Sequence, residues 1–249
     1  MCELLGFCSA RPENIKDQLR EFYSHSEQHR HGWGIMYPGL CEKGADKANE
    51  SEKLKKILQS LEPQPVLLGH IRFATVGSVK TVNCHPFTAR DNTGREWTLI
   101  HNGTIYSGSQ LMEFLSRQSG DTDSERLFLH LLKKLDAAQQ NGALDERDRF
   151  ELIDALVREM SPRNKLNLMI YDGEIMYIHK NMSDTMKYKK TPFGYLFSTA
   201  ALDNGEWKSV PTAQLLAFKD GKKIFTGEKH NGVFIPTLQY IKASDAMNI

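Results

Sequence analysis

Cys2, the second residue of the chain, could combine a nucleophile and a base at one position. If Met1 is removed, Cys2 becomes the N-terminal residue and carries both a thiol and a free α-amine. A deprotonated thiol is a strong nucleophile. An α-amine has a pKa of ~7.7–8.0, so near neutral pH it can accept the thiol proton. We therefore predict that Met1 is removed and that Cys2 is a nucleophile. The alternative is a structural cysteine, because a lone cysteine is most often a small buried residue.

Polar residues also gather at the ends of several predicted elements. Each has a structural explanation when taken alone. Arg72 could be a surface arginine, Asn102-Gly103 a turn, and Asp123 a favourable charge at a helix N-terminus. The segments are, in chain order, HGWG (His31–Gly34), GHIRFAT (Gly69–Thr75), NCHPF (Asn83–Phe87), HNGTI (His101–Ile105) and TDSE (Thr122–Glu125).

In this order and spacing, behind Cys2, the segments resemble those of the class II glutamine amidotransferases, a branch of the N-terminal nucleophile hydrolases. The likeness covers about the first half of the chain. A weaker likeness to the stand-alone members of the family rests on Phe197–Ala200 and Trp207. The resemblance implies one glutamine amidotransferase domain over residues 1–249, folded as a four-layer αββα sandwich.

The resemblance also implies a role for each matching residue. Cys2 would attack the carboxamide of glutamine, release ammonia and form a γ-glutamyl thioester, which water would convert to glutamate. The side-chain NH₂ of Asn102 and the N–H of Gly103 would form the oxyanion hole, where one donor is typically worth ~2.7–4 kcal/mol of transition-state stabilisation. Arg72 would bind the substrate α-carboxylate through two parallel hydrogen bonds, and Asp123 would pair with the α-ammonium.

Three more residues match the motifs and are predicted to line the substrate site: Thr75, Trp33 and His85. His85 and His101 could equally be structural histidines that fix loops, and either could carry a proton. We expect no cofactor. The run His29–His31 has no carboxylate or cysteine at a spacing suited to metal binding, so we also expect no metal site.

The composition restricts the partners that the chain can have. Lys+Arg number 32 and Asp+Glu 31, so the net charge of +1 argues against nucleic acid or an anionic membrane as the main partner. No apolar run approaches the ~20 residues that cross a bilayer, and no signal-peptide pattern is present. No C-x-x-C spacing occurs, so we interpret the cysteines as reduced thiols of a cytoplasmic protein: Cys2, Cys8, Cys41 and Cys84.

The elements that must position these residues follow an α+β order, with strands towards both ends. In the first part we predict strands over Cys2–Ser9, Gly32–Tyr37, Val66–Thr75 and Trp97–Ile100, a helix over Pro12–Phe22 and a short helix ending at Leu61. The strand Trp97–Ile100 is predicted to end in a turn at His101-Asn102-Gly103, because Asn-Gly favours positive φ.

The middle of the chain reads as helical and the last third as strands. Thr122–Glu125 has the spacing of a capping box, and an apolar stripe from Leu127 to Leu135 follows it. A second helix is predicted over Asp145–Met160. Hairpin turns are predicted at Asp172-Gly173 and Asp220-Gly221. The predicted strands are Leu166–Tyr171, Glu174–His179, Tyr195–Thr199, Gln214–Phe218 and Lys223–Phe225.

Three functions remain open on the sequence. The first is a glutamine amidotransferase or glutaminase that uses L-glutamine and passes ammonia to a separate synthase partner. The second is a stand-alone hydrolase of a γ-glutamyl amide bond in a larger metabolite. The third, an inactive regulatory module, is disfavoured because every residue with an implied catalytic role is present. A sandwich of this kind takes roughly 200–250 residues and the chain has no P-loop, so we expect no acceptor-activating domain.

Overall fold

The first strand serves two hydrophobic cores at once. In the computed structural model, which describes residues 2–236, β1 (Glu3–Glu13) packs Leu5 and Phe7 with residues of two helices. Its alternate residues Leu4 and Cys8 pack instead with residues of a second sheet. Because successive side chains of a strand point to opposite faces, one buried strand joins both layers.

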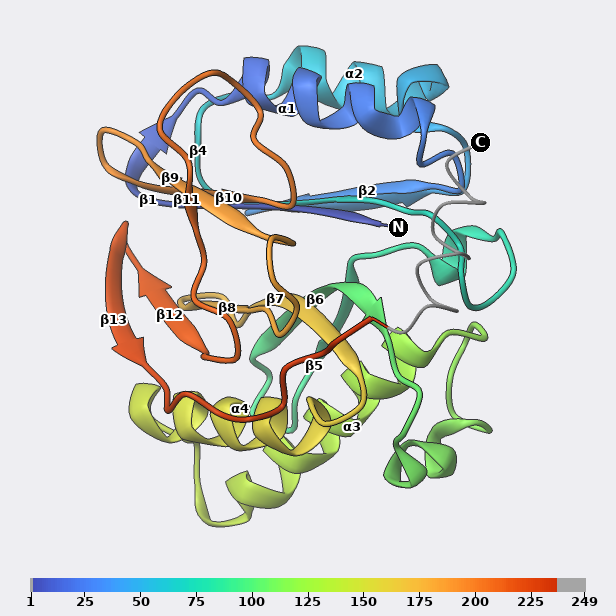
Figure 1. Cartoon of the computed structure of the whole chain (residues 1–249), viewed down its shortest axis with the longest axis vertical. Coiled ribbons are helices and arrows are strands. Elements are labelled where there is room, and N and C mark those ends of the chain that lie inside the picture. Colours follow the sequence, from blue (N-terminus) through green and yellow to red (C-terminus); the bar gives the residue numbers. More distant parts are fainter. Residues whose placement is uncertain (1, 237–249) are drawn as a thin grey trace.

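The first sheet has seven strands in the order β11-β9-β10-β1-β4-β2-β3, all paired antiparallel. Besides β1 it contains β2 (Trp33–Tyr37), β3 (Leu40–Gly44), β4 (Gln64–Ile71), β9 (Lys187–Lys190), β10 (Gly194–Ser198) and β11 (Lys208–Ser209). The helices α1 (Lys16–Ser24) and α2 (Glu52–Ser60) cover its outer face (Figure 1).

The second sheet has six strands in the order β13-β12-β8-β7-β6-β5, again antiparallel. Its strands are β5 (Phe87–Arg90), β6 (Glu96–Thr104), β7 (Lys165–Tyr171), β8 (Met176–His179), β12 (Leu216–Lys219) and β13 (Lys222–Thr226). The helices α3 (Asp123–Ala138) and α4 (Glu146–Met160) cover the face that points away from the first sheet (Figure 1).

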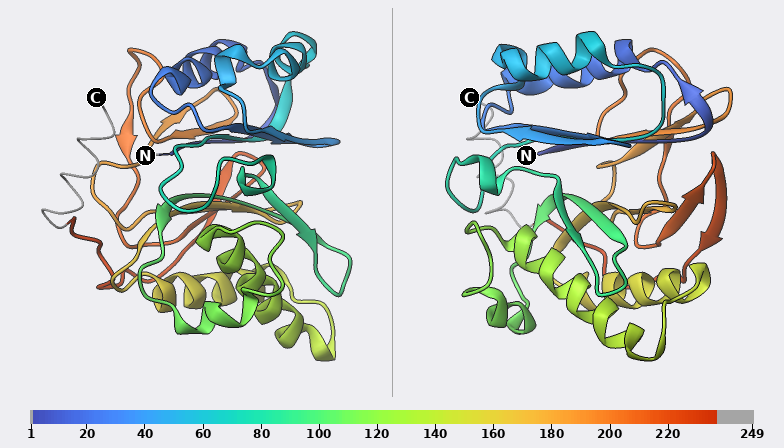
Figure 2. Two further views of the ribbon diagram at one scale, coloured as in Figure 1. Left: turned by 90° about the vertical axis from the view of Figure 1, so that its right-hand side faces the viewer. Right: turned by 180° about the vertical axis from the view of Figure 1, so that it is seen from behind.

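The two sheets face each other across an apolar layer, which gives the order helices, sheet, sheet, helices (Figures 1 and 2). Methionine is prominent in this layer, where its flexible side chain can fill irregular gaps. The layer includes Leu68, Ile100, Met36, Met169, Met176, Met186, Phe197 and Phe218. The predicted four-layer αββα sandwich is therefore confirmed.

Both predicted helix starts in the middle of the chain are confirmed. Thr122 Oγ1 accepts a hydrogen bond from the Glu125 N–H at 3.2 Å, and Asp145 Oδ1 accepts one from the Asp148 N–H at 2.8 Å. Each bond satisfies a backbone donor that has no partner inside its helix. The short 3₁₀ helices are η1 (His25–Glu27), η2 (Ala48–Glu50), η3 (Thr81–Asn83), η4 (Ser109–Phe114) and η5 (Gln139–Asn141).

The predicted turn at His101-Asn102-Gly103 is wrong. These residues continue strand β6, where Asn102 pairs with Asn167 and Gly103 with Leu166. Local propensity favoured a turn, but pairing with β7, more than sixty residues later, holds the segment extended. The predicted start of the first helix at Pro12 is also wrong, because β1 extends to Glu13.

Candidate active site

The sulfur of Cys2 lies against the chain that leaves strand β4. Glu3 pairs with Ile71 in the register of β1 and β4, so Cys2 lies beside the residues that follow Ile71. The Phe73 N–H donates to Cys2 Sγ at 3.3 Å, and the thiol lies 3.4 Å from the Phe73 carbonyl oxygen. Burial raises the pKa of the Cys2 thiol, whereas the Phe73 N–H and the charges of Arg72 and Lys165 act to lower it.

Arg72 is buried, with 3% of its surface exposed, and its guanidinium is held by the loop that follows it. Three of its five N–H groups donate to the carbonyl oxygens of Val76, Gly77 and Ser78, at distances of 3.1 to 3.4 Å. One of these bonds comes from Nη1 and two from Nη2, so the Nε–H makes none of the three. The guanidinium is thus oriented by the protein while it keeps donors for a carboxylate.

A polar network fixes that loop in turn. Ser78 donates to the Asp121 carboxylate through its backbone N–H at 3.1 Å and through its hydroxyl at 3.0 Å. Asn83 donates to the Ser78 carbonyl at 2.8 Å and accepts from the Asp121 N–H at 2.9 Å. The loop around Arg72 is therefore tied to the segment that leads into helix α3.

Asn102 and Gly103 lie at the end of β6, where β5 no longer accompanies it. The last pair of β5 with β6 is Phe87 with Leu99. The N–H and C=O of Leu166, the partner of Gly103, bond to Asn181 and His179. Because both groups of Leu166 face away from β6, its pair with Gly103 is not hydrogen-bonded, and the Gly103 N–H points towards the open edge.

The requirement for glycine at position 103 is steric. A Cβ there would overlap the carbonyl oxygen of Lys165 and the ring of His101. His101 is itself fixed, because its Nδ1 lies 2.9 Å from Ser124 Oγ and its Nε2 lies 3.2 Å from the Lys165 carbonyl oxygen. Burial lowers the pKa of His101, so the ring is neutral near pH 7.

Asp123 is the first residue of helix α3 and is 5% exposed. Its Oδ2 accepts a hydrogen bond from the Ile105 N–H at 2.7 Å, directly after strand β6, and its Oδ1 accepts one from the Ser124 N–H at 3.0 Å. The positive end of the helix dipole favours a carboxylate at this position. These bonds place the carboxylate of Asp123 beside the end of the strand that carries Asn102 and Gly103.

The other three predicted site residues differ in their accessibility. Thr75 is exposed on the loop after Arg72. Trp33 has no exposed surface, packs in the core beneath α1 and α2, and donates through Nε1 to Asp46 at 3.0 Å. His85 is 4% exposed, with its ring centroid 4.2 Å from that of His70 in a tilted arrangement, and burial lowers its pKa well below the ordinary range. These positions favour packing roles for Trp33 and His85.

Lys165, the first residue of β7, belongs to the site although no sequence motif contains it. It is 1% exposed, and its ammonium donates to Asn102 Oδ1 at 3.2 Å. A lysine at the start of a strand is usually a surface residue, so only the register with β6 identifies this one as part of the site.

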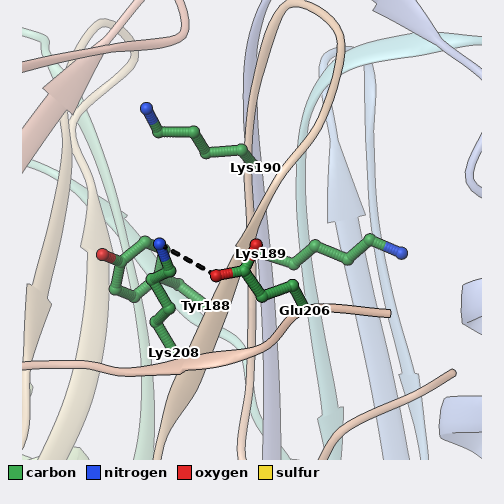
Figure 3. A pocket seen from close by; sticks show the side chains of 5 residues that line it. All are labelled: Tyr188, Lys189, Lys190, Glu206 and Lys208. Carbon is green, nitrogen blue, oxygen red and sulfur yellow. Dashed lines mark ion pairs between the residues drawn. The ribbon is translucent and has the colours of Figure 1, made fainter. Parts of the chain in front are cut away.

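A cavity of about 150 Å³ lies elsewhere, on the edge of the first sheet. Its lining residues are Tyr188, Lys189, Lys190, Glu206 and Lys208 (Figure 3), none of them predicted for the site. Lys208 pairs with Glu206 at 3.1 Å, and Lys189 pairs with Asp203 at 2.8 Å. Lysines are common on edge strands because they discourage pairing with other chains. This cavity is therefore not the candidate active site.

Among residues 2–236, no three His, Cys, Asp or Glu side chains are grouped so that they could hold a metal ion. No helix in that range has the length and apolar character needed to span a membrane.

Comparison with known proteins gives a consistent result. A family model for the class II glutamine amidotransferases matches residues 1–197. An uncharacterized protein of Methanocaldococcus jannaschii is 27% identical, over 98% of this chain and 76% of its own length. YafJ of Escherichia coli, named as a candidate glutamine amidotransferase, is 28% identical over 92% of this chain and 96% of its own.

The fold also matches that of a solved structure. Glutamine phosphoribosylpyrophosphate amidotransferase from B. subtilis superposes with a TM-score of 0.68 at 17% identity, over 95% of this chain and 50% of that protein. At this identity the likeness concerns the fold alone. The chain spans about half of that enzyme.

Proposed function

The chain belongs to the class II glutamine amidotransferases, and from this premise we propose that it hydrolyses the side-chain amide of free L-glutamine through Cys2. The observation that carries the proposal is that Cys2 Sγ lies against Phe73, beside Arg72, and within electrostatic reach of Lys165, whose ammonium bonds to Asn102 at the strand end that also holds Gly103. A nucleophile, an oxyanion hole and a cation for the substrate carboxylate are the parts that this reaction needs.

The nucleophile requires prior removal of Met1, which frees the α-amine of Cys2. That amine takes the thiol proton, directly or through water, and the thiolate attacks the carboxamide carbon. The Phe73 N–H, 3.3 Å from Sγ, and the nearby charges of Arg72 and Lys165 stabilise the thiolate against the cost of burial.

The carboxamide oxygen becomes negatively charged in the tetrahedral intermediate. We place it between Asn102 Nδ2 and the Gly103 N–H, which lie on one strand end held by β7. When the intermediate collapses, the C–N bond breaks and the nitrogen leaves as ammonia, with a proton returned from the α-amine. Water then cleaves the γ-glutamyl thioester, which yields glutamate and frees Cys2.

The charged head of the amino acid would fix the substrate. The guanidinium of Arg72 would bind the α-carboxylate, with Thr75 at the exposed rim. Asp123 would pair with the α-ammonium. The ammonia passes to an acceptor on a separate protein or is released. We assign this reaction to one domain over residues 1–249 and to the cytoplasm, without a cofactor.

The test is a pair of measurements on the purified protein. Initial rates of glutamate formation are compared for glutamine and for γ-glutamyl dipeptides, in the native protein and in Cys2→Ala. The matched control is Cys41→Ala, which removes an exposed thiol of strand β3. We expect Cys2→Ala alone to abolish turnover. Unchanged turnover in Cys2→Ala would refute the assignment of Cys2 as the nucleophile. Much faster turnover of the dipeptides would show that a γ-glutamyl amide, and not glutamine, is the substrate. No turnover of either compound would favour an inactive module.

A further inference from the structure

Two lysines among residues 2–236 are almost fully buried, Lys165 and Lys180. Lys180 is 0% exposed, and its ammonium donates to Ser209 Oγ at 2.8 Å and to the Met186 carbonyl at 3.3 Å, among residues that take no part in the proposed chemistry. Lys165 instead donates to Asn102 Oδ1. A buried ammonium is costly, so its contact with a proposed catalytic side chain needs a physical account.

The register of the second sheet explains why these two side chains meet. Asn102 pairs with Asn167 and Thr104 pairs with Lys165, so Lys165 is the diagonal neighbour of Asn102 on the same face. Ile100, two positions before Asn102 on β6, and Met169, four positions after Lys165 on β7, lie in the layer between the sheets. By the two-residue period of strands, Asn102 and Lys165 face the same layer, towards the first sheet, whose strand β1 follows Cys2.

The contact determines that the carbonyl oxygen of the Asn102 amide points towards Lys165 and that its NH₂ points away. A protonated lysine has three donors and no acceptor, so it can bond only to the carbonyl oxygen of the amide. The NH₂ of Asn102 is then directed away from Lys165. With the amide reversed, its NH₂ would face the ammonium and its carbonyl oxygen would occupy the place of an oxyanion donor, where it would repel the developing negative charge.

We propose that Lys165 is a positioning residue that orients the side-chain NH₂ of Asn102 towards the substrate oxyanion. The inference rests on the proposed function, because it assumes that Asn102 serves the oxyanion hole. Lys165 acts through Asn102 and is not assigned a contact with the charged head of the substrate. It therefore affects kcat much more than KM.

The orientation depends on the charge of Lys165. Burial lowers the pKa of its ammonium to about 8, and the nearby Cys2 thiolate acts to raise it. The titratable groups around it are the thiol and α-amine of Cys2, the residue before β1, and His101 on β6. Above this pKa the neutral amine carries a lone pair and can accept a hydrogen bond from the amide NH₂. Either amide orientation is then tolerated, so kcat falls on the alkaline side.

The main test is a double-mutant cycle on kcat. We expect Lys165→Met to lower kcat at least tenfold, within the ~10²–10³-fold cost of losing one oxyanion donor, with KM changed less than threefold. Because Lys165 acts through Asn102, the variant with both Lys165→Met and Asn102→Ala should be no slower than Asn102→Ala alone. Lys180→Met removes an equally buried ammonium and should keep the native kcat.

Two further measurements separate orientation from simple folding defects. Lys165→Arg keeps a charged group that only donates, so it should recover part of kcat and move the alkaline fall of kcat to higher pH. In Lys165→Met the fall near pH 8 should disappear. In the native protein kcat should decrease above about pH 8, and the comparison with Lys165→Met separates this fall from titration of the Cys2 α-amine, whose ordinary pKa of ~7.7–8.0 lies in the same range.

Native kcat in Lys165→Met would overturn the proposal. So would a double variant in which the loss of kcat equals the product of the losses in Lys165→Met and Asn102→Ala. So would an alkaline fall that is unchanged in Lys165→Arg. These outcomes are distinct from failure of the proposed function, in which the native protein shows no turnover that depends on Cys2. Circular dichroism and thermal melting of each variant identify any that is unfolded; if Lys165→Met is unfolded, the shift of the alkaline fall between the native protein and Lys165→Arg decides.

Discussion

Replacement of Gly103 by alanine tests the steric construction of the oxyanion site. Gly103 lies at the end of β6, where an added Cβ would overlap the Lys165 carbonyl oxygen and His101 Nε2. The first obstacle is backbone of the paired strand, and the second is a ring held between Ser124 and Lys165. Neither can move away by rotation of a flexible side chain, so the strand end itself must shift.

The expected effect has two parts. Overpacking of this kind typically costs 1–3 kcal/mol, and ~2–4 °C of Tm per kcal/mol for a protein of this size gives a decrease of about 2–12 °C. The shift also moves both proposed oxyanion donors, Asn102 Nδ2 and the Gly103 N–H. We therefore expect Gly103→Ala to lower kcat by ~10²–10³-fold. Differential scanning fluorimetry and a glutaminase assay at saturating glutamine measure the two effects.

Gly108→Ala is the matched control. Its backbone is extended at φ 178°, and an added Cβ would meet only side-chain atoms of Ile105 at 3.2 Å and Leu111 at 3.4–3.5 Å, which can move slightly. This variant should keep native kcat and lose at most about 1 kcal/mol of stability. Native kcat in Gly103→Ala despite a lowered Tm would show that the strand end does not serve catalysis. An unchanged Tm would refute the steric reasoning itself.

Three other predictions concern charged side chains. Asp123→Asn removes the charge opposite the substrate α-ammonium but keeps an acceptor for the Ile105 N–H, so kcat/KM for glutamine should fall ~10–150-fold; an unchanged kcat/KM contradicts the assignment. Arg72→Lys replaces the oriented guanidinium by a point charge, so KM should rise at least about tenfold; a native KM contradicts carboxylate binding. Burial opposes ionisation of Glu3, but hydrogen bonds from its histidine partners lower its pKa from 4.5 to about 2. The stabilisation of the folded protein by ionised Glu3 is present above pH 4.5 and lost as pH falls towards 2. Tm over that range should therefore fall less steeply in Glu3→Gln than in the native protein. Equal slopes in the two proteins would contradict the prediction.

The sequence predicted well the parts of the fold that depend on local signals. The caps at Thr122 and Asp145 need only neighbouring residues, and their side chains accept the expected backbone donors. The hairpin turns at Asp172-Gly173 and Asp220-Gly221 are confirmed as well, with φ of 90° at Gly173 and 67° at Gly221. In each case the residue type and the local conformation agree without help from distant chain.

Features that depend on distant pairing were missed or assigned wrongly. The segment Asn102-Gly103 has the propensity of a turn but is held extended by β7. The strand β9, Lys187–Lys190, has no apolar alternation because it lies near the edge of its sheet and is half exposed. Strands of this kind take their structure from their neighbours more than from their own residues.

The candidate site shows the same division. Its residues were found because their motifs are specific to a family, and the structure brings the segments that carry them together. The groups that hold these residues in position lie outside the motifs. The bond from Lys165 to Asn102 joins residues 63 positions apart. The groups that hold the Arg72 guanidinium are backbone carbonyls, which cannot be predicted from residue type.

Covalent trapping tests the central claim most directly. The native protein is incubated with a diazo-ketone analogue of glutamine, and the adduct is located by intact mass and peptide mapping. We predict one adduct per chain, on the sulfur of Cys2 as the N-terminal residue, and protection by excess glutamine. An active protein that retains Met1, or one that is inactivated without an adduct on Cys2, would contradict the account.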